Sequence, residues 1–269
     1  TDGHLISTPH VGGPGRNLHG SIDRSNLGLT EIRSHVWMGV IWINLSDTAP
    51  NFEDSMKDLI DRWADFDRPL FHGGSESSFT IEVAANWKLA VENYCESYHL
   101  PWVHPGLNTY SRLEDHYHIE HKNIFSGQGT KVYKQLEDKE GNSFPDFPNL
   151  NDKWDTAAEY IAVYPNVLLG VHRDHTFAII LIPDGPEKTY EHVHLFYSCK
   201  NTSKQLRREN MKLWKNVFEE DVPVVQGMQK GRHAVKFDGG RFSPVMDSPT
   251  HCFHYWVASE IQNGRKQKD

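Results

Sequence analysis

The chain has 269 residues, a formal net charge of −8 at pH 7, and 38% hydrophobic and 24% charged residues, which is the composition of a folded globular protein. The acidic balance argues against a nucleic-acid partner, and no apolar run is long enough to cross a membrane. Three widely spaced cysteines cannot form a disulfide framework, so we expect a reducing compartment, the cytoplasm. Seventeen histidines are an excess that favours metal or proton chemistry.

The first third of the chain changes from loop to strand to helix. Residues 1–20 are rich in glycine and proline and predict a loop. Residues 31–46 carry β-branched and aromatic side chains and predict one or two strands. Residues 51–66 space their apolar side chains three and four apart, which predicts an amphipathic helix. The segment 77–105 begins as a strand and is expected to become a helix near Asn86.

The rest of the chain predicts a mostly antiparallel sheet and one long helix. The helix is expected over 203–231, and the polar segment 137–156 predicts a loop or lid. Strand-length apolar or alternating runs, separated by turn residues, occupy 116–125, 129–136, 160–173, 176–185, 189–200 and 250–261.

The helix near Asn86 carries the first candidate site. On a helical wheel Glu92, Glu96 and His99 lie on one side, opposite the apolar residues. Pro101 should end this helix and allow a loop to return His104 toward His99. The two imidazoles and neighbouring carboxylates then face one point; a solvated polar face is the alternative that these residues leave open.

The long helix carries the second candidate. Asp221 projects into the middle of its apolar stripe, where an ionised carboxylate is costly unless a cation or several donors meet it. A salt-bridged acid near the kink expected at Pro223 is the alternative. Together, His99, His104 and Asp221 form the set of two histidines and one carboxylate that leaves open positions on Fe(II) for oxygen chemistry.

These segments resemble a known family. Asn86–Lys88 and Glu92–His104 (ENYCESYHLPWVH) resemble the iron-binding signature of the large (α) subunits of Rieske-type non-haem iron oxygenases. Glu220 and Asp221 are similar to the third-ligand segment, and 240–261 to the closing strand and helix. Residues 1–10 and 36–45 resemble the end of the Rieske domain.

The resemblance implies a fold and a set of site residues. The expected fold is α+β: a helix-grip (START/Bet v 1-like) domain, in which an antiparallel sheet surrounds a long C-terminal helix. Residues 1–47 would be the C-terminal remnant of a Rieske β domain, and 48–269 the catalytic domain. His99, His104 and Asp221 would ligate the mononuclear Fe(II). Glu96 would join a ligating histidine to a cluster-ligating histidine of the neighbouring subunit.

The resemblance also implies cofactors and partners. Electrons from NAD(P)H would arrive through a reductase or ferredoxin and a 2Fe–2S Rieske cluster, and O2 would oxidise an aromatic or quaternary-amine substrate by mono- or dioxygenation. Glu96, where many ring-hydroxylating members have Asp, is similar to the carnitine and glycine-betaine branch. The cluster-binding Cys-x-His and Cys-x-x-His pair is not in this chain, so the cluster is expected on a preceding segment. Cys252 and His254 are interpreted as core packing in a closing strand, and a homotrimer is expected.

Three other hypotheses compete with this one. His172 and Asp174, with His233 and either Arg241 or Ser243, resemble the site of a 2-oxoglutarate-dependent oxygenase. A cupin site would use His116, His118, Glu120 and His121, although strand alternation puts only some of them on one face. A non-catalytic helix-grip ligand-binding domain would share the fold, but would favour an apolar residue at position 221.

Overall fold

The computed structural model describes residues 2–46 and 48–266 of the chain. They form two compact units: the first comprises the described residues of 2–37 and 41–52, and the second those of 38–40 and 53–266. Among the described residues, no helix combines the length and the apolar character that crossing a bilayer requires.

The first unit contains a short helical turn, η1 (Arg24–Asn26), and most of a two-stranded hairpin, β1 (Arg33–Trp37) and β2 (Val40–Asn44). Residues 31–46 therefore form two strands. Met38 and Gly39 join them with φ of 52° and 75°, the positive values that a tight hairpin turn requires. The rings of Trp37, Trp42 and Phe52 pack together, with centroids 5.3–6.5 Å apart.

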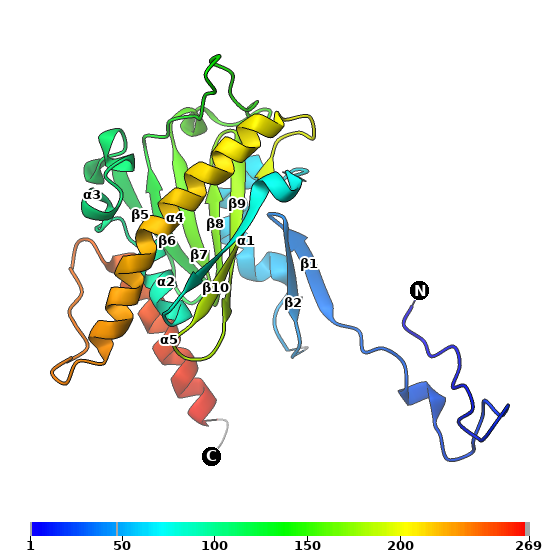
Figure 1. Ribbon diagram of the computed structural model, residues 1–269. Helices are drawn as coiled ribbons and strands as arrows, with labels where there is room; N and C mark the ends of the chain where they lie inside the picture. Colours follow the sequence, from blue (N-terminus) through cyan, green and yellow to red (C-terminus); the bar gives the residue numbers. More distant parts are fainter. Residues whose placement is uncertain (1, 47, 267–269) are drawn as a thin grey trace. The chain divides into compact units, whose positions relative to one another are not determined.

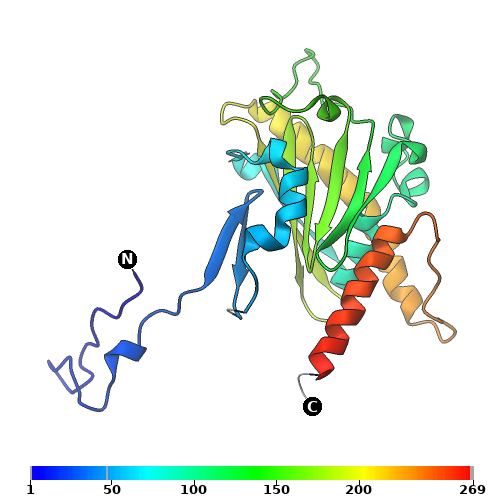
Figure 2. The same ribbon diagram turned by 180° about the vertical axis from the view of Figure 1, so that it is seen from behind.

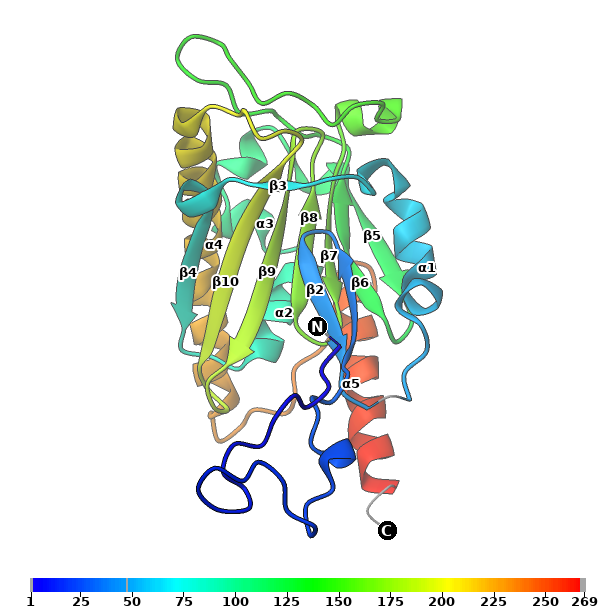
Figure 3. The same cartoon turned by 90° about the vertical axis from the view of Figure 1, so that its right-hand side faces the viewer.

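The second unit is built on a fully antiparallel eight-stranded sheet, which confirms the predicted sheet (Figure 3). The strand order is β3-β10-β9-β8-β7-β6-β5, and β4 also pairs with β10. The strands are β3 (Phe71–His72), β4 (Ser78–Val83), β5 (His116–His121), β6 (Phe125–Thr130), β7 (Ala158–Val163), β8 (Val167–Val171), β9 (His175–Pro183) and β10 (Thr189–Tyr197).

In the described part of the chain the strands are accompanied by the α-helices α1 (Phe52–Arg62), α2 (Trp87–Cys95), α3 (Leu100–Val103), α4 (Lys204–Arg232) and α5 (Ser248–Lys266). Helix α4 runs along one face of the sheet (Figure 1), and α2 packs against β6, β7, α4 and α5. The view from behind shows α1 on the other side of the sheet (Figure 2). Short 3-10 turns occupy Ala64–Phe66, Gly74–Ser77, Leu107–Thr109, Leu113–Asp115 and Asp152–Asp155.

The core of the second unit lies between α4, α2 and the sheet. Because strand side chains alternate, β10 directs Val193 and Leu195 into it, and both are fully buried. The apolar stripe of α4 supplies Trp214, Phe218 and Val225. The sequence predicts this stripe correctly, and the predicted helices over 51–66 and 203–231 are also confirmed.

The runs 116–125 and 160–173, predicted as single strands, each cover parts of two strands separated by a turn. Two other predicted strands are wrong. Residues 250–261 lie in α5, where Phe253 is buried and Trp256 and Val257 pack against the core at the three- and four-residue spacing of a helix. Cys252 and His254 therefore lie in a helix, and His254 contacts Glu92 instead of the core. The predicted strand over 129–136 ends at Thr130, since its hydroxyl accepts a hydrogen bond from the Val132 amide as the chain turns away.

The helix that starts at Asn86 is shorter than predicted. It ends at Cys95, and Glu96 has an extended backbone. Pro101 does not end this helix but lies in the first turn of α3, a position that tolerates proline because it needs no amide donor. The wheel that places Glu96 and His99 on one continuous helix is therefore wrong, although both residues still reach one site.

A buried acid joins the sheet to the end of α1. Glu159 of β7 is fully buried, and its carboxylate accepts hydrogen bonds of 2.6–2.8 Å from Arg62, Trp63, Tyr117 and Lys153. Burial alone raises the pKa of Glu159, but the bonds from Arg62, Lys153 and Trp63 lower it by more, so the net pKa is below the ordinary value. This carboxylate is therefore ionised in the folded state.

Replacing Glu159 should destabilise the protein in a pH-dependent way. We expect Glu159→Gln to lower the free energy of unfolding by about 1–3 kcal/mol near neutral pH, because Arg62 and Lys153 lose an ionised acceptor. Because folding lowers the pKa of this carboxyl, its ionisation stabilises the folded state. The full stabilisation is present when the pH is above the ordinary pKa of 4.5, and it is lost as the pH falls through the pKa of the folded state. Urea unfolding from about pH 7 to about pH 4 should therefore show the difference between wild type and variant shrinking with acidification.

The control for this experiment is Glu260→Gln, which removes an exposed acid on α5. Its unfolding free energy should match the wild type throughout. A Glu159→Gln variant as stable as the wild type at neutral pH would contradict the assigned role.

Candidate metal centre

The segment from Asn86 to His104 forms a helix, a corner and a second short helix. Asn86 caps α2, its side chain accepting a hydrogen bond from the Lys88 amide at 3.1 Å. After α2 ends, the Glu96 carboxylate accepts hydrogen bonds from the Tyr98 and His99 amides. His99 is then the residue that precedes α3, and His104 is the residue that follows it. One short helix thus fixes the spacing of the two histidines.

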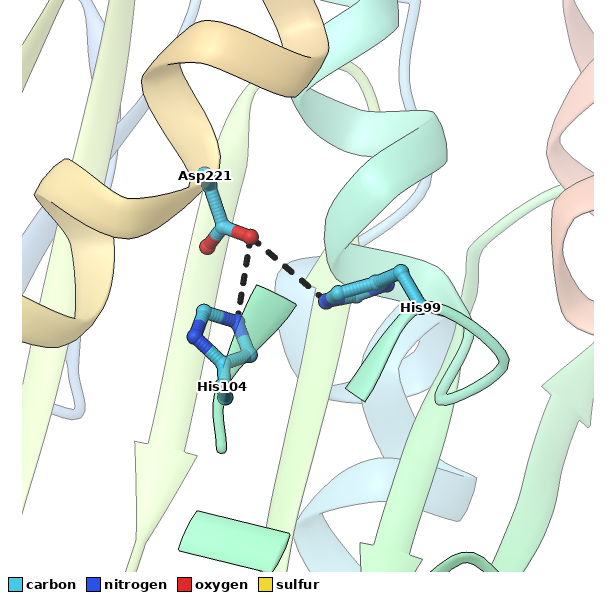
Figure 4. A group of neighbouring side chains, drawn as sticks. All are labelled: His99, His104 and Asp221. Carbon is cyan, nitrogen blue, oxygen red and sulfur yellow. Dashed lines mark ion pairs between the residues drawn. The ribbon is translucent and has the colours of Figure 1, made fainter. Parts of the chain in front are cut away.

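Helix α4 brings the third residue to this corner. Figure 4 shows His99, His104 and Asp221 converging, with both rings directed at one carboxylate. The Nε2 atoms of His99 and His104 lie 3.5 and 3.0 Å from Asp221 Oδ1, and all three candidate ligand atoms lie within 4.8 Å of one another. The tertiary structure therefore brings together the three residues predicted as metal ligands.

The opposite nitrogen of each imidazole faces a carboxylate. His99 Nδ1 lies 2.6 Å from Glu96 Oε1, and His104 Nδ1 lies 2.8 Å from Glu220 Oε2. An Nδ1–H that donates to a carboxylate leaves the lone pair on Nε2, which is the arrangement usual for histidines that bind metal. The contact from Glu96 to His99 is one half of the predicted role of Glu96. The sequence identified Glu220 only by resemblance and did not predict its contact with His104.

This donor set fits a divalent transition metal. Asp221 Oδ1 is buried and accepts no hydrogen bond of good geometry among the described residues, although two imidazole nitrogens approach it. A buried carboxylate oxygen without a donor is costly, and a cation between these atoms would satisfy it. Burial lowers the pKa of His104, but Asp221 and Glu220 raise it by more, so the net pKa is above the ordinary value. The negative charges of Asp221 and Glu220 therefore favour a cation at this site.

The residues of the 2-oxoglutarate hypothesis do not form a comparable group. Within residues 2–46 and 48–266, His99, His104 and Asp221 are the one set of three histidine, cysteine or acidic side chains close enough to share an ion. His172 and Asp174 are fully buried beside β8 and β9, whereas His233 follows the end of α4 and contacts Glu187.

The cupin hypothesis fails for a related reason. His116 contacts Ser111 and Gln128, and His118 and Glu120 both bond Ser248. His121 points the other way, toward Asp58, as strand alternation requires.

A largely apolar pocket opens beside the three candidate ligands, all of which line it. Aromatic residues make up much of its wall, and burial raises the pKa of the Tyr94, Tyr110 and Tyr160 hydroxyls, which therefore stay neutral. The sequence predicts no pocket residues. The sequence does contain a pattern that could have identified them, a series of residues at helical spacing on one face of α4. All of these residues line the pocket: Asn210, Leu213, Trp214, Val217, Phe218 and Asp221.

Comparison with known proteins identifies the family. The family model described as "Ring hydroxylating alpha subunit (catalytic domain)" matches residues 73–263. The matched segment includes the corner between α2 and α3, Asp221 and most of α5. The chain belongs to this family, as the sequence resemblance predicts.

Two curated relatives illustrate the similarity. The oxygenase subunit of carnitine monooxygenase from Acinetobacter pittii (strain PHEA-2) is 23% identical over 214 residues, which are 78% of this chain and 55% of the relative. The chloroplastic choline monooxygenase of Atriplex hortensis is 25% identical over 245 residues, which are 88% of this chain and 52% of the relative. The chain thus spans about half the length of these relatives.

Solved structures share the fold. The quaternary ammonium Rieske monooxygenase CntA in complex with its substrate L-carnitine aligns with a TM-score of 0.66 at 21% identity, covering 90% of this chain and 64% of that one. Naphthalene 1,2-dioxygenase from Rhodococcus sp., bound to indole, aligns with a TM-score of 0.56 at 15% identity, covering 86% and 65%. The mixed helix and antiparallel sheet fold is therefore that of Rieske oxygenase catalytic domains.

The contact between Glu220 and His104 should matter for metal binding. We expect Glu220→Ala to weaken Fe(II) binding about 10-fold or more, because His104 loses the acceptor that orients its ring. Anaerobic competition with a chelator would measure the dissociation constant. Glu219→Ala is the matched control, since Glu219 is the preceding residue on α4 and contacts Lys215 instead. Equal affinities in the two variants would show that Glu220 has no such role.

Proposed function

We propose that this chain is the catalytic part of a Rieske-type oxygenase that holds a mononuclear Fe(II) through His99, His104 and Asp221. The observation that carries the proposal is the convergence of two imidazole Nε2 atoms on one buried carboxylate oxygen that lacks a hydrogen-bond donor. When bound, an Fe(II) in such a set activates O2 at its open coordination positions. The adjoining pocket supplies a place for an organic substrate beside those positions.

The protein residues around the proposed metal have distinct tasks. Glu96 and Glu220 hold the imidazoles of His99 and His104 in the tautomer that presents Nε2. The aromatic and aliphatic pocket wall excludes water from the reacting end of the substrate and orients it. We assign to Glu96 the further task of linking this site to a cluster-ligating histidine of a neighbouring subunit.

The proposed substrate is a quaternary amine, with an aromatic compound as the alternative. Three observations support the amine: the relatives named for carnitine and choline, Glu96 in place of the aspartate common in ring-hydroxylating members, and the aromatic pocket wall. Neutral tyrosines and a tryptophan attract a trimethylammonium group through cation–π interactions. A quaternary amine would be hydroxylated on carbon, and hydroxylation of an N-methyl group would be followed by cleavage of its C–N bond, which gives formaldehyde and the demethylated amine. An aromatic substrate would be hydroxylated on its ring.

The whole protein would need further parts. We propose that residues 1–47 are the C-terminal remnant of a Rieske domain and that 48–269 form a catalytic domain of the helix-grip class. The 2Fe–2S cluster would lie on a further segment, and a reductase or ferredoxin would deliver electrons from NAD(P)H. Subunits would associate as a homotrimer in the cytoplasm, which suits the three free cysteines.

Removing the candidate carboxylate ligand tests the proposal directly. Asp221→Ala should abolish stoichiometric Fe(II) binding and turnover while the protein stays folded, since two imidazoles alone hold Fe(II) weakly. Metal analysis after gel filtration measures the iron, and circular dichroism measures the fold. Glu219→Ala again serves as the control on α4. Full iron occupancy in Asp221→Ala would overturn the ligand assignment and the proposed function.

Glu96 is expected to act in electron delivery and not as a metal ligand. Glu96→Gln retains the size of the side chain and an acceptor for His99 but loses the charge, so iron should remain bound. Rapid mixing of the complete, cluster-containing protein with substrate and O2 should show cluster oxidation slowed by orders of magnitude. Glu114→Gln, an exposed change, should leave that rate unaltered. Wild-type cluster oxidation in Glu96→Gln would refute the assigned link.

A further inference from the structure

A second, small pocket lies at the start of α4. Its wall comprises residues 71–73, the connection from β10 to α4 and Arg207, and none of its lining residues also lines the pocket beside Asp221. Arg207 precedes Asp221 by 14 residues, which is a rise of about 21 Å along a helix. The open space of this pocket is about 230 Å³. Sites for drug-sized ligands begin at roughly 300 Å³, so the pocket suits a smaller ligand.

A buried guanidinium forms part of the wall. Arg207 is 8% exposed, and its Nη1 donates hydrogen bonds to the carbonyl and hydroxyl oxygens of Thr202 at 2.6 and 2.8 Å. Neither Nε, which is shielded from solvent, nor Nη2 donates a hydrogen bond to any residue that the structure describes. A buried charge with an unsatisfied edge and no counter-ion destabilises a folded protein. The edge formed by Nε and Nη2 therefore calls for an acceptor from outside the chain.

This edge of an arginine is the one that grips oxyanions. Its two N–H bonds are parallel and match two oxygens of one carboxylate or phosphate. Arg62 binds Glu159 through Nε and Nη2, both at 2.8 Å. Arg173 binds Asp146 through the same two atoms, at 2.9 and 2.5 Å. Arg207 presents the same pair of donors without a carboxylate to receive them.

Two neighbours place the guanidinium at the pocket. A Cβ on Gly73 would lie 2.5 Å from Arg207 Cδ, so the Gly73 backbone packs against the end of the side chain that carries Nε. Thr202, which holds Nη1, also lines the pocket. The guanidinium therefore extends along the wall from Gly73 to Thr202. A side chain at position 73 would displace it.

The rest of the wall adds positive charge and no negative charge. Lys200 lines the pocket, with Nζ 5.6 Å from the centre of the Phe71 ring. No acidic side chain in the described part of the chain lines it, and Glu76, which follows this wall segment, contacts Arg208 instead. The first turn of a helix also carries a partial positive charge. In a chain of net charge −8, this pocket is thus a local site for an anion.

We propose that the pocket binds a tetrahedral inorganic oxyanion, phosphate or sulfate, through Nε and Nη2 of Arg207 and the ammonium group of Lys200. The planar fork of arginine receives two oxygens of the anion, and the lysine supplies a compact charge for a third. The bound anion joins β3, the β10–α4 connection and the start of α4, so it stabilises the folded state. The site is independent of the iron and of the proposed oxygenase activity.

Thermal unfolding of the full chain in phosphate tests the inference. At constant pH and ionic strength, about 10 mM phosphate should raise the Tm by about 2–4 °C, because the anion binds only the folded state. Acetate should raise it by less than about 1 °C, since a planar monoanion fills the fork but does not engage the lysine. Arg207→Lys keeps the charge and loses the fork, so it should weaken phosphate binding about 10-fold. Arg207→Met should abolish it.

The matched control is Arg208→Met, which removes the next arginine on α4, an exposed residue paired with Glu76, and should keep the wild-type shift. If Arg207→Met does not fold, the exposed Lys200→Met variant carries the test and should weaken binding about 3-fold or more. Line broadening of the phosphorus-31 resonance of phosphate measures binding directly in each folded variant.

Two results would overturn the inference. Phosphate stabilises proteins in general by exclusion from their surface, so an equal shift in wild type, Arg207→Lys and Lys200→Met would reveal only that effect. Stabilisation by acetate equal to that by phosphate would show that the pocket does not select a tetrahedral anion. Iron enters neither measurement, so either result leaves the proposed function untouched.

Discussion

A carboxylate oxygen that no hydrogen-bond donor satisfies, held against two imidazole nitrogens, is the constraint around which the second unit is organised. Asp221 occupies a position of α4 whose neighbours along the stripe, Val217, Phe218 and Val225, pack against the core or line the pocket. An ionised carboxylate at such a position destabilises the folded protein when no cation lies beside it. The position becomes favourable when Asp221 shares a bound cation with His99 and His104. The stability of the fold and the proposed chemistry therefore depend on the same three side chains.

The corner between α2 and α3 is the second part of that arrangement. A continuous helix would place His99 and His104 about 140° apart around its axis, since five residues turn it by about 500°. The break after Cys95, the cap that Glu96 gives to the next amides, and Pro101 in the first turn of α3 instead put both rings on one side. Because Glu96 both caps this turn and accepts from the His99 ring, backbone geometry and imidazole tautomer are fixed by one side chain.

Helix α4 serves the pocket and the core at the same time. Trp214 and Phe218 belong to the buried cluster and also line the pocket, so the stripe that holds the helix on the sheet also forms the wall along which a substrate would lie. The ionised Glu159 contributes on the other side of the sheet, because neighbouring residues of β7 point to opposite faces and Tyr160 faces the pocket. Stability and function are thus supported from opposite faces of one sheet.

Local patterns in the sequence determine many of the elements: the helix over 203–231, the start of a helix at Asn86 and the strands over 176–185 and 189–200 follow from periodicity and capping. The combination of His99, His104 and Asp221 could also be proposed from sequence, because an acid in an apolar stripe and two histidines beside a proline are visible there. Periodicity misassigned 250–261, since a short aromatic run suits a strand or a helix until its packing partners are known.

Only the tertiary structure decided which side chains share the site. Glu220 reaches His104 across 116 positions of the chain, and Asn210 and Lys134 meet one pocket from α4 and from an irregular segment. These relations depend on how separate elements pack, which no local pattern contains. The sequence therefore determined the candidate metal ligands, and the packing of α4 against the sheet and the α2–α3 corner decided their surroundings and the pocket.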